Sequence, residues 1–246
     1  AIQMACALVA RAPEKKVLVI ASDVARYDLD TPGEATQGCG AVAMLISANP
    51  RLLEIDPEVG NHTEDVMDFW RPNYRSTALV DGKYSTKIYL RALKKAWENF
   101  RDVSSLAFDD FSHFCYHLPF SRMAQKAHQH LAKLNKADMT AEQIEAQIAD
   151  TLSYNRIIGN SYTASMYIGL TSLLENCKQN IAGTKIGFFS YGSGCVAEFF
   201  SGTVVAGYEK YLHCTEHKAM LDNREEVSYE KYLELYRHPD PRDGSD

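Results

Sequence analysis

The stretch FSHFCYHLPFSRMAQKAH, residues 111–128, contains three histidines and a cysteine where two sequence patterns meet. Residues 111–117 are mostly apolar and aromatic, which predicts a buried strand, and the residues after Pro119 have helical spacing to about Leu134. His117 therefore falls at the end of a strand, just before a helix. Working side chains in α/β folds commonly occupy such a position, although a lone histidine is by default a structural residue.

Other segments extend this alternation along the chain. Strands are predicted at 16–22, 41–47 and, as two strands joined by a glycine turn, at 185–205; helices are predicted at 85–100, 140–152 and 161–176. Thr140 and Gln143 have the spacing of a capping box. The opening AIQMACALVA is apolar on nearly every face, which predicts a central buried helix. Helices alternating with buried strands favour a layered α/β fold.

Composition limits the class of protein. The 246 residues, 46% of them hydrophobic, suffice for a large core in one unit or two packed halves. No run of about 18 apolar residues occurs, so no membrane partner is expected. The net charge of −6 is spread along the chain without a basic block, so no nucleic-acid partner is expected either. Six widely spaced cysteines predict free thiols and a cytoplasmic location.

A metal site is not predicted. Alternation along the strand would place His113, Cys115 and His117 on one face, about 6.5 Å apart from one to the next. Zinc ligands usually come from more than one element, and no CxxC pair occurs in the sequence.

Two further stretches each allow two interpretations. In FFSYGSGCVAEFF, Gly192 and Gly194 permit a tight turn whose free amides could hold an oxyanion or a thioester carbonyl, but a plain hairpin is the alternative. In IGNSYTAS, Asn160 begins an apolar helix and could serve simply as its N-cap.

Taken together, seven motifs carry a family resemblance. In order they are ASDVARY, TQGCGAVAML, EDVMDFWRP, VDGKYS, FCYHLPFSRM, IIGNSYTASMY and FFSYGSGCVAEFF. Their order and spacing, from Ala1 to about Tyr236, resemble hydroxymethylglutaryl-CoA (HMG-CoA) synthase. The resemblance implies a thiolase-like fold, two α/β halves in five αβαβα layers, incomplete at the N-terminus here, in a homodimer. Residues 1–110 would be the remainder of the first half, with family-specific insertions, and 111–246 the second half.

The resemblance also implies roles for individual residues. His117 matches the catalytic histidine that orients and polarises the acetoacetyl substrate, and Asn160 matches the asparagine that assists it. Tyr27 matches a tyrosine near the acyl group, while Asp23 and Asp68 match aspartates that help to shape the site.

Further positions match parts of the family that contact the acyl group or CoA. Ser193, with Gly192 beside it, matches a turn whose backbone lies against the acyl group. Arg122 and Lys126 match lysines that reach the CoA moiety, and arginine at the first position keeps the charge but changes its geometry. Thr36 is a further candidate for contact with CoA or the acyl group.

The nucleophilic cysteine and general-base glutamate of the family match no residue here. Both precede the segment that AIQMA resembles, so they are expected before Ala1, and none of the six cysteines takes the role. A cysteine directly before this helix would meet the positive end of the helix dipole, which lowers the pKa of a thiol.

The implied activity is the condensation of acetyl-CoA with acetoacetyl-CoA, through an acetyl-cysteine intermediate, to HMG-CoA and CoA in the mevalonate pathway, with no cofactor beyond these thioesters. Two alternatives stay open. One is a polyketide β-branching synthase that uses acyl groups bound to carrier proteins, although VDGKYS looks more like the mevalonate enzymes. The other is a non-catalytic CoA-binding fragment or subunit.

Overall fold

A computed structural model describes residues 1–238 of the chain. Residues 1–212 form one compact unit, and the described residues from His213 onward belong to a second. The expected division after residue 110 stays a prediction, and residues 239–246 of its second half lie outside the described residues.

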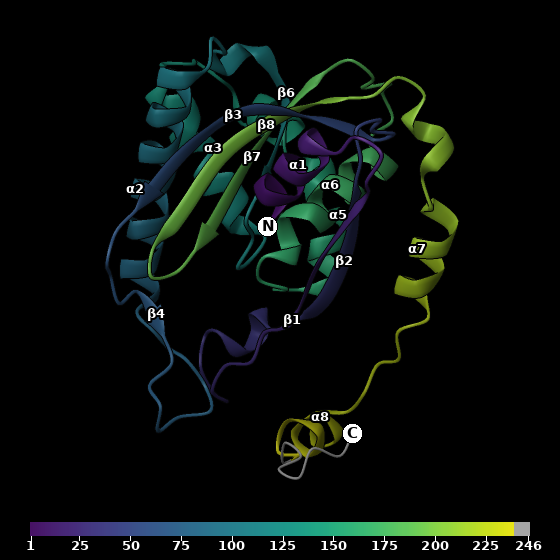
Figure 1. Cartoon of the computed structure of the whole chain (residues 1–246). Coiled ribbons are helices and arrows are strands. Elements are labelled where there is room, and N and C mark those ends of the chain that lie inside the picture. Colours follow the sequence, from purple (N-terminus) through teal and green to yellow (C-terminus); the bar gives the residue numbers. More distant parts are fainter. Residues whose placement is uncertain (239–246) are drawn as a thin grey trace. The chain divides into compact units, whose positions relative to one another are not determined.

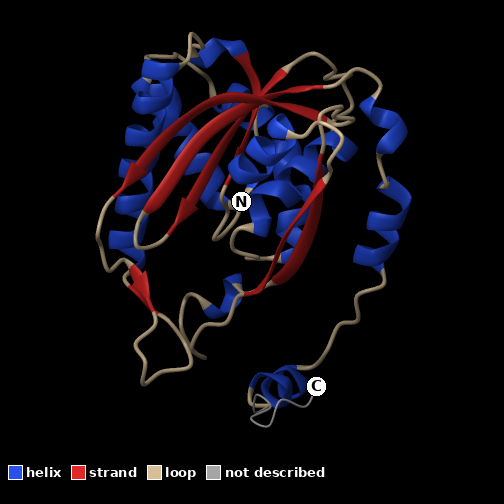
Figure 2. Ribbon diagram, in the orientation of Figure 1, coloured by secondary structure: helices blue, strands red, loops and turns tan. Residues whose placement is uncertain are grey.

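The central sheet of the first unit has four strands in the order β3-β8-β7-β6, which are labelled in Figure 1 and drawn in red in Figure 2. The pair β6–β7 is parallel, and the other two pairs are antiparallel. The strands are β3 (Leu53–Thr63), β6 (Phe111–Tyr116), β7 (Lys185–Gly192) and β8 (Val196–Val204). Phe188 pairs with Phe200 and Phe189 with Phe199, and because side chains alternate along strands, the two pairs supply cores on opposite faces of the sheet.

Helices cover both faces of this sheet (Figure 1). On one face α2 (Gly82–Val103) and α3 (Arg122–Leu134) enclose an aromatic core around Trp97. On the other face α6 (Ala164–Asn176) packs against β6 and β7, with α5 (Ala149–Ile158) beside it.

A second sheet lies on the far side of α6. It consists of β1 (Val17–Val24) and β2 (Cys39–Ile46), paired antiparallel, and α1 (Ile2–Arg11) packs against both strands. The described residues thus supply the order helix, sheet, helix, sheet, which is four of the five layers expected from the resemblance. A small hairpin of β4 (Phe69–Trp70) and β5 (Leu79–Val80) and the short turn η1 (Glu34–Thr36) belong to the loops beside the sheets.

The strand-to-helix junction around His117 has the predicted form, since β6 ends at Tyr116 and α3 begins at Arg122. The predicted helix 140–152 is instead two helices, α4 (Ala141–Ala146) and α5. Between them Gln147 accepts the Phe114 N–H at its carbonyl (3.1 Å) and donates its side-chain amide to the Phe111 carbonyl (3.1 Å). Pairing with the edge of β6 therefore interrupts the helix, although the capping box of Thr140 and Gln143 is present as predicted.

The prediction that α1 is buried on nearly every face is wrong for the described residues. Ile2, Ala5 and Val9 are buried, but Met4 is 71% exposed and Leu8 48% exposed. The reason is that α1 packs on one side, against the β1–β2 sheet.

The second unit contains α7 (Cys214–Asp222) and α8 (Tyr229–Tyr236), and neither helix has a buried residue. The Ser228 hydroxyl caps α8 by accepting the Lys231 N–H (3.2 Å). Within residues 1–238, every helix is too short or too polar to traverse a bilayer.

Candidate active site

A cavity of about 710 Å³ opens at the end of β6, within the first unit. Four segments far apart in sequence form most of its wall: the loop after β1, the start of α2 with the β4–β5 hairpin, the β6–α3 junction, and the turn before α6. Of the ten residues singled out from the sequence, His117, Asn160, Tyr27, Ser193 and Thr36 line it.

Two glycines allow the loop after β1 to touch the turn before α6. A Cβ atom on Gly38 would lie 2.2 Å from the Ile158 carbonyl oxygen, and one on Gly159, at φ +84°, would lie 2.3 Å from the Gln37 carbonyl oxygen. No side chain fits either position, so glycine is required for the two backbones to approach. This approach brings Tyr27 to Asn160, and the Asn160 side-chain amide donates to the Tyr27 hydroxyl (2.7 Å).

Asn160 is held at three points and is 2% exposed. Besides the bond to Tyr27, its backbone N–H donates to the Thr36 carbonyl (3.0 Å), and its Oδ1 accepts the Tyr162 N–H (2.9 Å). Because α6 begins at Ala164 and Thr163 holds the N-cap position, Asn160 is not the N-cap. One N–H of the side-chain amide remains for a ligand in the cavity.

The backbone of His117 is fixed at both polar atoms. Its N–H donates to the Phe189 carbonyl (2.8 Å), and its carbonyl accepts from the Tyr89 hydroxyl (2.9 Å). The imidazole lies near the rings of Tyr89 and Tyr191, with centroids 6.4 and 6.2 Å away. These contacts fix where the ring lies.

The protonation state of His117 follows from its surroundings. Burial lowers the pKa of the imidazole to about 4, although a hydrogen bond to the Tyr162 carbonyl opposes this shift. The ring is therefore neutral at pH 7. Since a carbonyl only accepts, one ring nitrogen carries the proton toward Tyr162, and the other is left as a hydrogen-bond acceptor.

Asp68 does not line the cavity but holds residues of its wall in place. The carboxylate is fully buried and accepts from the Tyr191 hydroxyl (2.6 Å), the Gly194 N–H (3.0 Å) and the Ser85 hydroxyl (3.2 Å). Burial, and next the Asp68 carboxylate, raises the pKa of Tyr191. Asp68 thus fixes the glycine turn, where Gly194 has φ +117° and Ser193 lines the cavity, with Gly192 ending β7 just before it.

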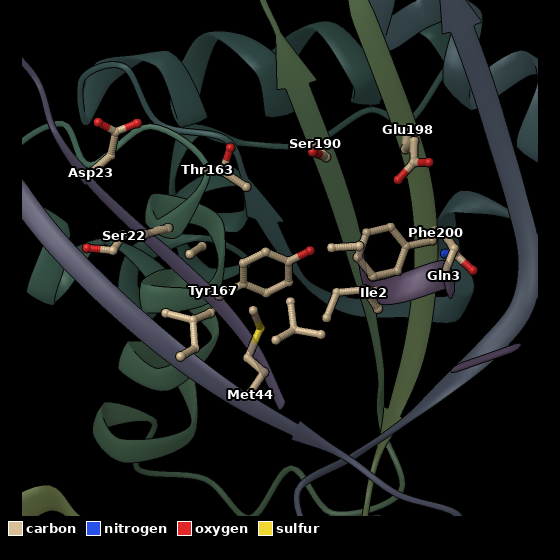
Figure 3. A pocket seen from close by; sticks show the side chains of 15 residues that line it. Ile2, Gln3, Ser22, Asp23, Met44, Thr163, Tyr167, Ser190, Glu198 and Phe200 are labelled. Atoms are coloured by element: carbon tan, nitrogen blue, oxygen red, sulfur yellow. The ribbon is translucent and has the colours of Figure 1, made fainter. Parts of the chain in front are cut away.

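The remaining predicted residues lie outside the cavity wall. Arg122 and Lys126 are exposed on α3, one turn apart, and the Lys126 Nζ lies 5.6 Å from the centre of the Phe120 ring, which lines the cavity. Asp23 is exposed at the end of β1 and borders a second cavity of about 350 Å³. In Figure 3, Asp23 and Glu198 lie on opposite sides of the Tyr167 ring in that second cavity.

Three tyrosines of the site were not singled out from the sequence. Tyr89 and Tyr191 flank His117, and Tyr162 contacts both His117 and Asn160. Tyr162 and Tyr191 lie within the quoted motifs, and Tyr191 alternates with Phe189 along β7, so strand alternation gave a signal for Tyr191. Tyr89 sits inside an ordinary amphipathic helix and gave none.

The candidate metal ligands on β6 do not gather. Cys115 belongs to the core on the α6 side, His113 pairs with the Ser112 hydroxyl (3.1 Å), and the His117 ring lies between tyrosines. Within residues 1–238 no group of three or more His, Cys, Asp or Glu side chains is arranged to hold a metal, and all six cysteines are free thiols.

Comparison with known proteins shows which family the chain resembles. The family model described as hydroxymethylglutaryl-coenzyme A synthase C terminal matches residues 54–144 and 132–241. A hydroxymethylglutaryl-CoA synthase from Enterococcus faecalis is 43% identical over 236 residues, which cover 96% of this chain and 61% of that protein. The chain spans about three fifths of the length of such relatives.

Two further matches are a solved structure and an enzyme of polyketide biosynthesis. A crystal structure of an HMG-CoA synthase complexed with CoA matches with a TM-score of 0.90 at 40% identity, covering 98% of this chain and 62% of the other. A polyketide-biosynthesis 3-hydroxy-3-methylglutaryl-ACP synthase from Bacillus subtilis is 30% identical, over 92% of this chain and 57% of that protein. With its thiolase-like α/β fold and these matches, the chain belongs to the hydroxymethylglutaryl-CoA synthase family.

Proposed function

We propose that the protein condenses acetyl-CoA with acetoacetyl-CoA to give HMG-CoA and free CoA, and that this chain supplies the groups that act on the acetoacetyl ketone. The observation that carries the proposal is the convergence of His117, Asn160, Tyr27 and Ser193, from separate segments, on one cavity. A chain that only supported a partner would have no physical need to fix these polar groups around an open cavity.

The cavity suits a thioester. Its volume lies within the roughly 300–1,000 Å³ of ordinary ligand pockets, and Phe69, Leu79 and Met123 provide apolar surface for an acyl chain. Arg122 and Lys126 lie on the exposed side of α3, where a CoA phosphate could reach them. The CoA complex of a relative at 40% identity supports this choice of ligand.

The chemistry divides between this chain and groups expected before Ala1. By family resemblance, an upstream cysteine takes the acetyl group from acetyl-CoA and an upstream glutamate removes a methyl proton. The resulting carbanion attacks the ketone carbon, and the ketone oxygen becomes an alkoxide that must gain a proton. Water then hydrolyses the bond between the product and the cysteine.

His117 and Asn160 act on that oxygen. The spare N–H of Asn160 donates to it, and negative charge developing there raises the pKa of the nearby imidazole. His117 can then take up the proton that the glutamate removed from the methyl group and pass it to the alkoxide. A histidine that is neutral before the reaction has a ring nitrogen free to accept that proton. Burial thus keeps the His117 ring neutral and the Tyr162 contact orients its proton, so the ring can carry a further proton during the reaction and is not a permanent cation.

We further propose that the protein is a cytoplasmic homodimer of the mevalonate pathway. The 30% identical polyketide relative supports one alternative function, that of a synthase that takes acyl groups from carrier proteins. A CoA-binding subunit without catalysis is the other.

A substrate comparison tests the proposal. The natural polypeptide that carries these residues is incubated with acetyl-CoA and acetoacetyl-CoA, and separately with the same acyl groups on an acyl carrier protein, while thiol release and product mass are followed. We expect HMG-CoA from the CoA thioesters at a far higher kcat/KM. Preference for the carrier would establish the polyketide alternative, and CoA binding without product would establish the non-catalytic one.

A further inference from the structure

Tyr162 has a backbone conformation that side chains rarely adopt. Its φ is +48°, in the left-handed region, and it directly precedes Thr163, the N-cap of α6. For residues other than glycine this region is sterically unfavourable, with asparagine and aspartate the best tolerated. Such a conformation persists only where surrounding contacts hold it, and it is often found at functional sites.

Those contacts involve three residues of the proposed active site. The Tyr162 N–H donates to the Asn160 Oδ1 (2.9 Å), the Tyr162 carbonyl faces the His117 ring, and the Tyr162 hydroxyl faces that of Tyr27. The carbonyl also accepts from the Ser165 hydroxyl (2.7 Å), which anchors the turn to α6. Each of the three polar groups of Tyr162 therefore contacts a different residue of the site.

The two backbone contacts each select one of two alternative states, the amide orientation of Asn160 and the tautomer of His117. An asparagine amide can flip by exchanging its oxygen and nitrogen, but an N–H facing Oδ1 keeps Nδ2 toward Tyr27 and the cavity. An imidazole can carry its single proton on either nitrogen, but a carbonyl facing one nitrogen keeps the proton there. The left-handed turn presents the N–H and the carbonyl of one residue to these two partners at once.

We infer that Tyr162 is a positioning residue, whose left-handed backbone selects the tautomer of His117 and the amide orientation of Asn160. This inference rests on the proposed function for its kinetic consequences, whereas its structural content concerns the ring proton of His117 and can be measured without substrate.

The variants separate the backbone of Tyr162 from its side chain. Tyr162→Val places a β-branched side chain where φ is positive and should displace the carbonyl and the N–H. Tyr162→Asn tolerates that backbone but lacks the ring and hydroxyl, and Tyr162→Phe loses the hydroxyl alone. Lys136→Val is the matched control, because Lys136 is exposed, has φ +56° and lies in the turn after α3, away from the cavity.

The first readout is the ¹⁵N spectrum of histidine-labelled natural polypeptide at pH 7, with the His117 signals assigned by their loss in His117→Ala. Wild type should show one neutral tautomer, as should Tyr162→Asn, Tyr162→Phe and Lys136→Val. Tyr162→Val should show a mixture. A mixture of tautomers in wild type would overturn the inference even if Tyr162→Val does not fold.

The second readout is kinetic. Tyr162→Val should lower kcat by roughly 10- to 100-fold, part of the ~10²–10⁴-fold that a positioned acid–base group supplies, while Tyr162→Asn loses distinctly less. Lys136→Val should lose stability without a change in kcat. Equal losses in kcat for Val and Asn, with one tautomer in both, would refute the role of the backbone. An inactive wild type with a single His117 tautomer would instead refute the proposed function and leave the positioning intact.

Discussion

Two histidines of the opening stretch, His117 and His128, are both buried enough that their pKa values fall to about 4, yet they occupy opposite kinds of environment. His128, on α3, is fully buried and both its ring nitrogens have protein partners. His117, at the end of β6, has one nitrogen held by Tyr162 and lines the cavity. A lowered pKa alone therefore does not identify the histidine that can do chemistry.

The environment of His128 is fully determined by its partners. The Gln147 amide nitrogen donates to the Phe111 carbonyl, so the Gln147 Oε1 must accept from the His128 Nε2 (2.7 Å). The His128 Nδ1 then accepts from the Tyr116 hydroxyl (2.9 Å). No hydrogen-bonding capacity is left for a ligand, and this ring joins α3 and the α4–α5 turn to β6. A ring nitrogen that can still accept a hydrogen bond beside a cavity, rather than burial, distinguishes His117.

Replacement of His117 should have the largest effect. We expect His117→Ala to reduce kcat for condensation by about 10²–10⁴-fold, the range for loss of a positioned acid–base group, while acetylation of the enzyme by acetyl-CoA is spared. The free energy of unfolding should change by less than about 1 kcal/mol, because water in the cavity can replace the ring. Steady-state rates, intact mass after incubation with acetyl-CoA, and urea denaturation measure the three quantities. Unchanged condensation kinetics would remove His117 from the mechanism.

Replacement of His128 should have the reverse pattern. His128→Leu leaves the Tyr116 hydroxyl and the Gln147 Oε1 buried without partners, so we expect a loss of about 2–5 kcal/mol in urea denaturation at pH 7.5. The kcat of the folded fraction should stay within about threefold of wild type, since no atom of His128 lines the cavity. The double variant Tyr116→Phe, His128→Leu should lose less than the sum of the single losses. Strict additivity would show that the two side chains are not coupled.

Acid should weaken the His128 environment in a defined window. The imidazole binds a proton near pH 6.5 when the chain is unfolded but only near pH 4 when folded, so its contribution is complete above about 6.5 and is lost as the pH falls toward 4. Between pH 7.5 and 5 this amounts to roughly 2 kcal/mol. The loss caused by His128→Leu should therefore shrink over that interval. A constant difference between wild type and variant would show that His128 does not titrate with this shift.

Local patterns in the sequence predicted the strand that leads to His117, the helix that follows it and the capping box of α4, because these depend on neighbouring residues. The contact between Tyr27 and Asn160 spans 133 positions and depends on close packing at Gly38 and Gly159, which no local pattern reports. The family resemblance named both residues of this pair, but it could not show that they touch.

Two residues of the same type with the same predicted role differ in burial and in location in the structure. Asp23 and Asp68 were both expected to shape the site, yet Asp68 is fully buried beneath it and Asp23 is exposed beside a different cavity. Strand β3 was not predicted, because its register shifts between Ile55 and Val59, around Pro57, and the irregular pairing disguises the alternation. Burial and register are set by the whole fold, so composition at one position could not reveal them.

The smallest effect is expected where water can replace a lost partner. At the cavity wall Asp28 accepts from Arg75 and from the Thr77 hydroxyl (2.5 Å), which ties the loop after β1 to the segment before β5. The Arg75 side chain is 31% exposed and that of Asp28 is 42% exposed, so this ion pair should contribute at most about 1 kcal/mol, unlike the buried bonds of His128.

We therefore expect Arg75→Gln to change the free energy of unfolding by no more than about 1 kcal/mol. Because Asp28 lines the cavity, a looser loop should raise the KM for acetoacetyl-CoA a few-fold with kcat unchanged, and salt, which screens exposed charges, should reduce the difference from wild type. Lys95→Gln is the matched control, since it breaks an exposed pair with Glu98 (3.5 Å) whose residues do not line the cavity. A loss above about 2 kcal/mol in Arg75→Gln alone would mean that the Arg75–Asp28 pair behaves as a buried interaction, like the hydrogen bonds of His128, because an exposed pair cannot cost that much.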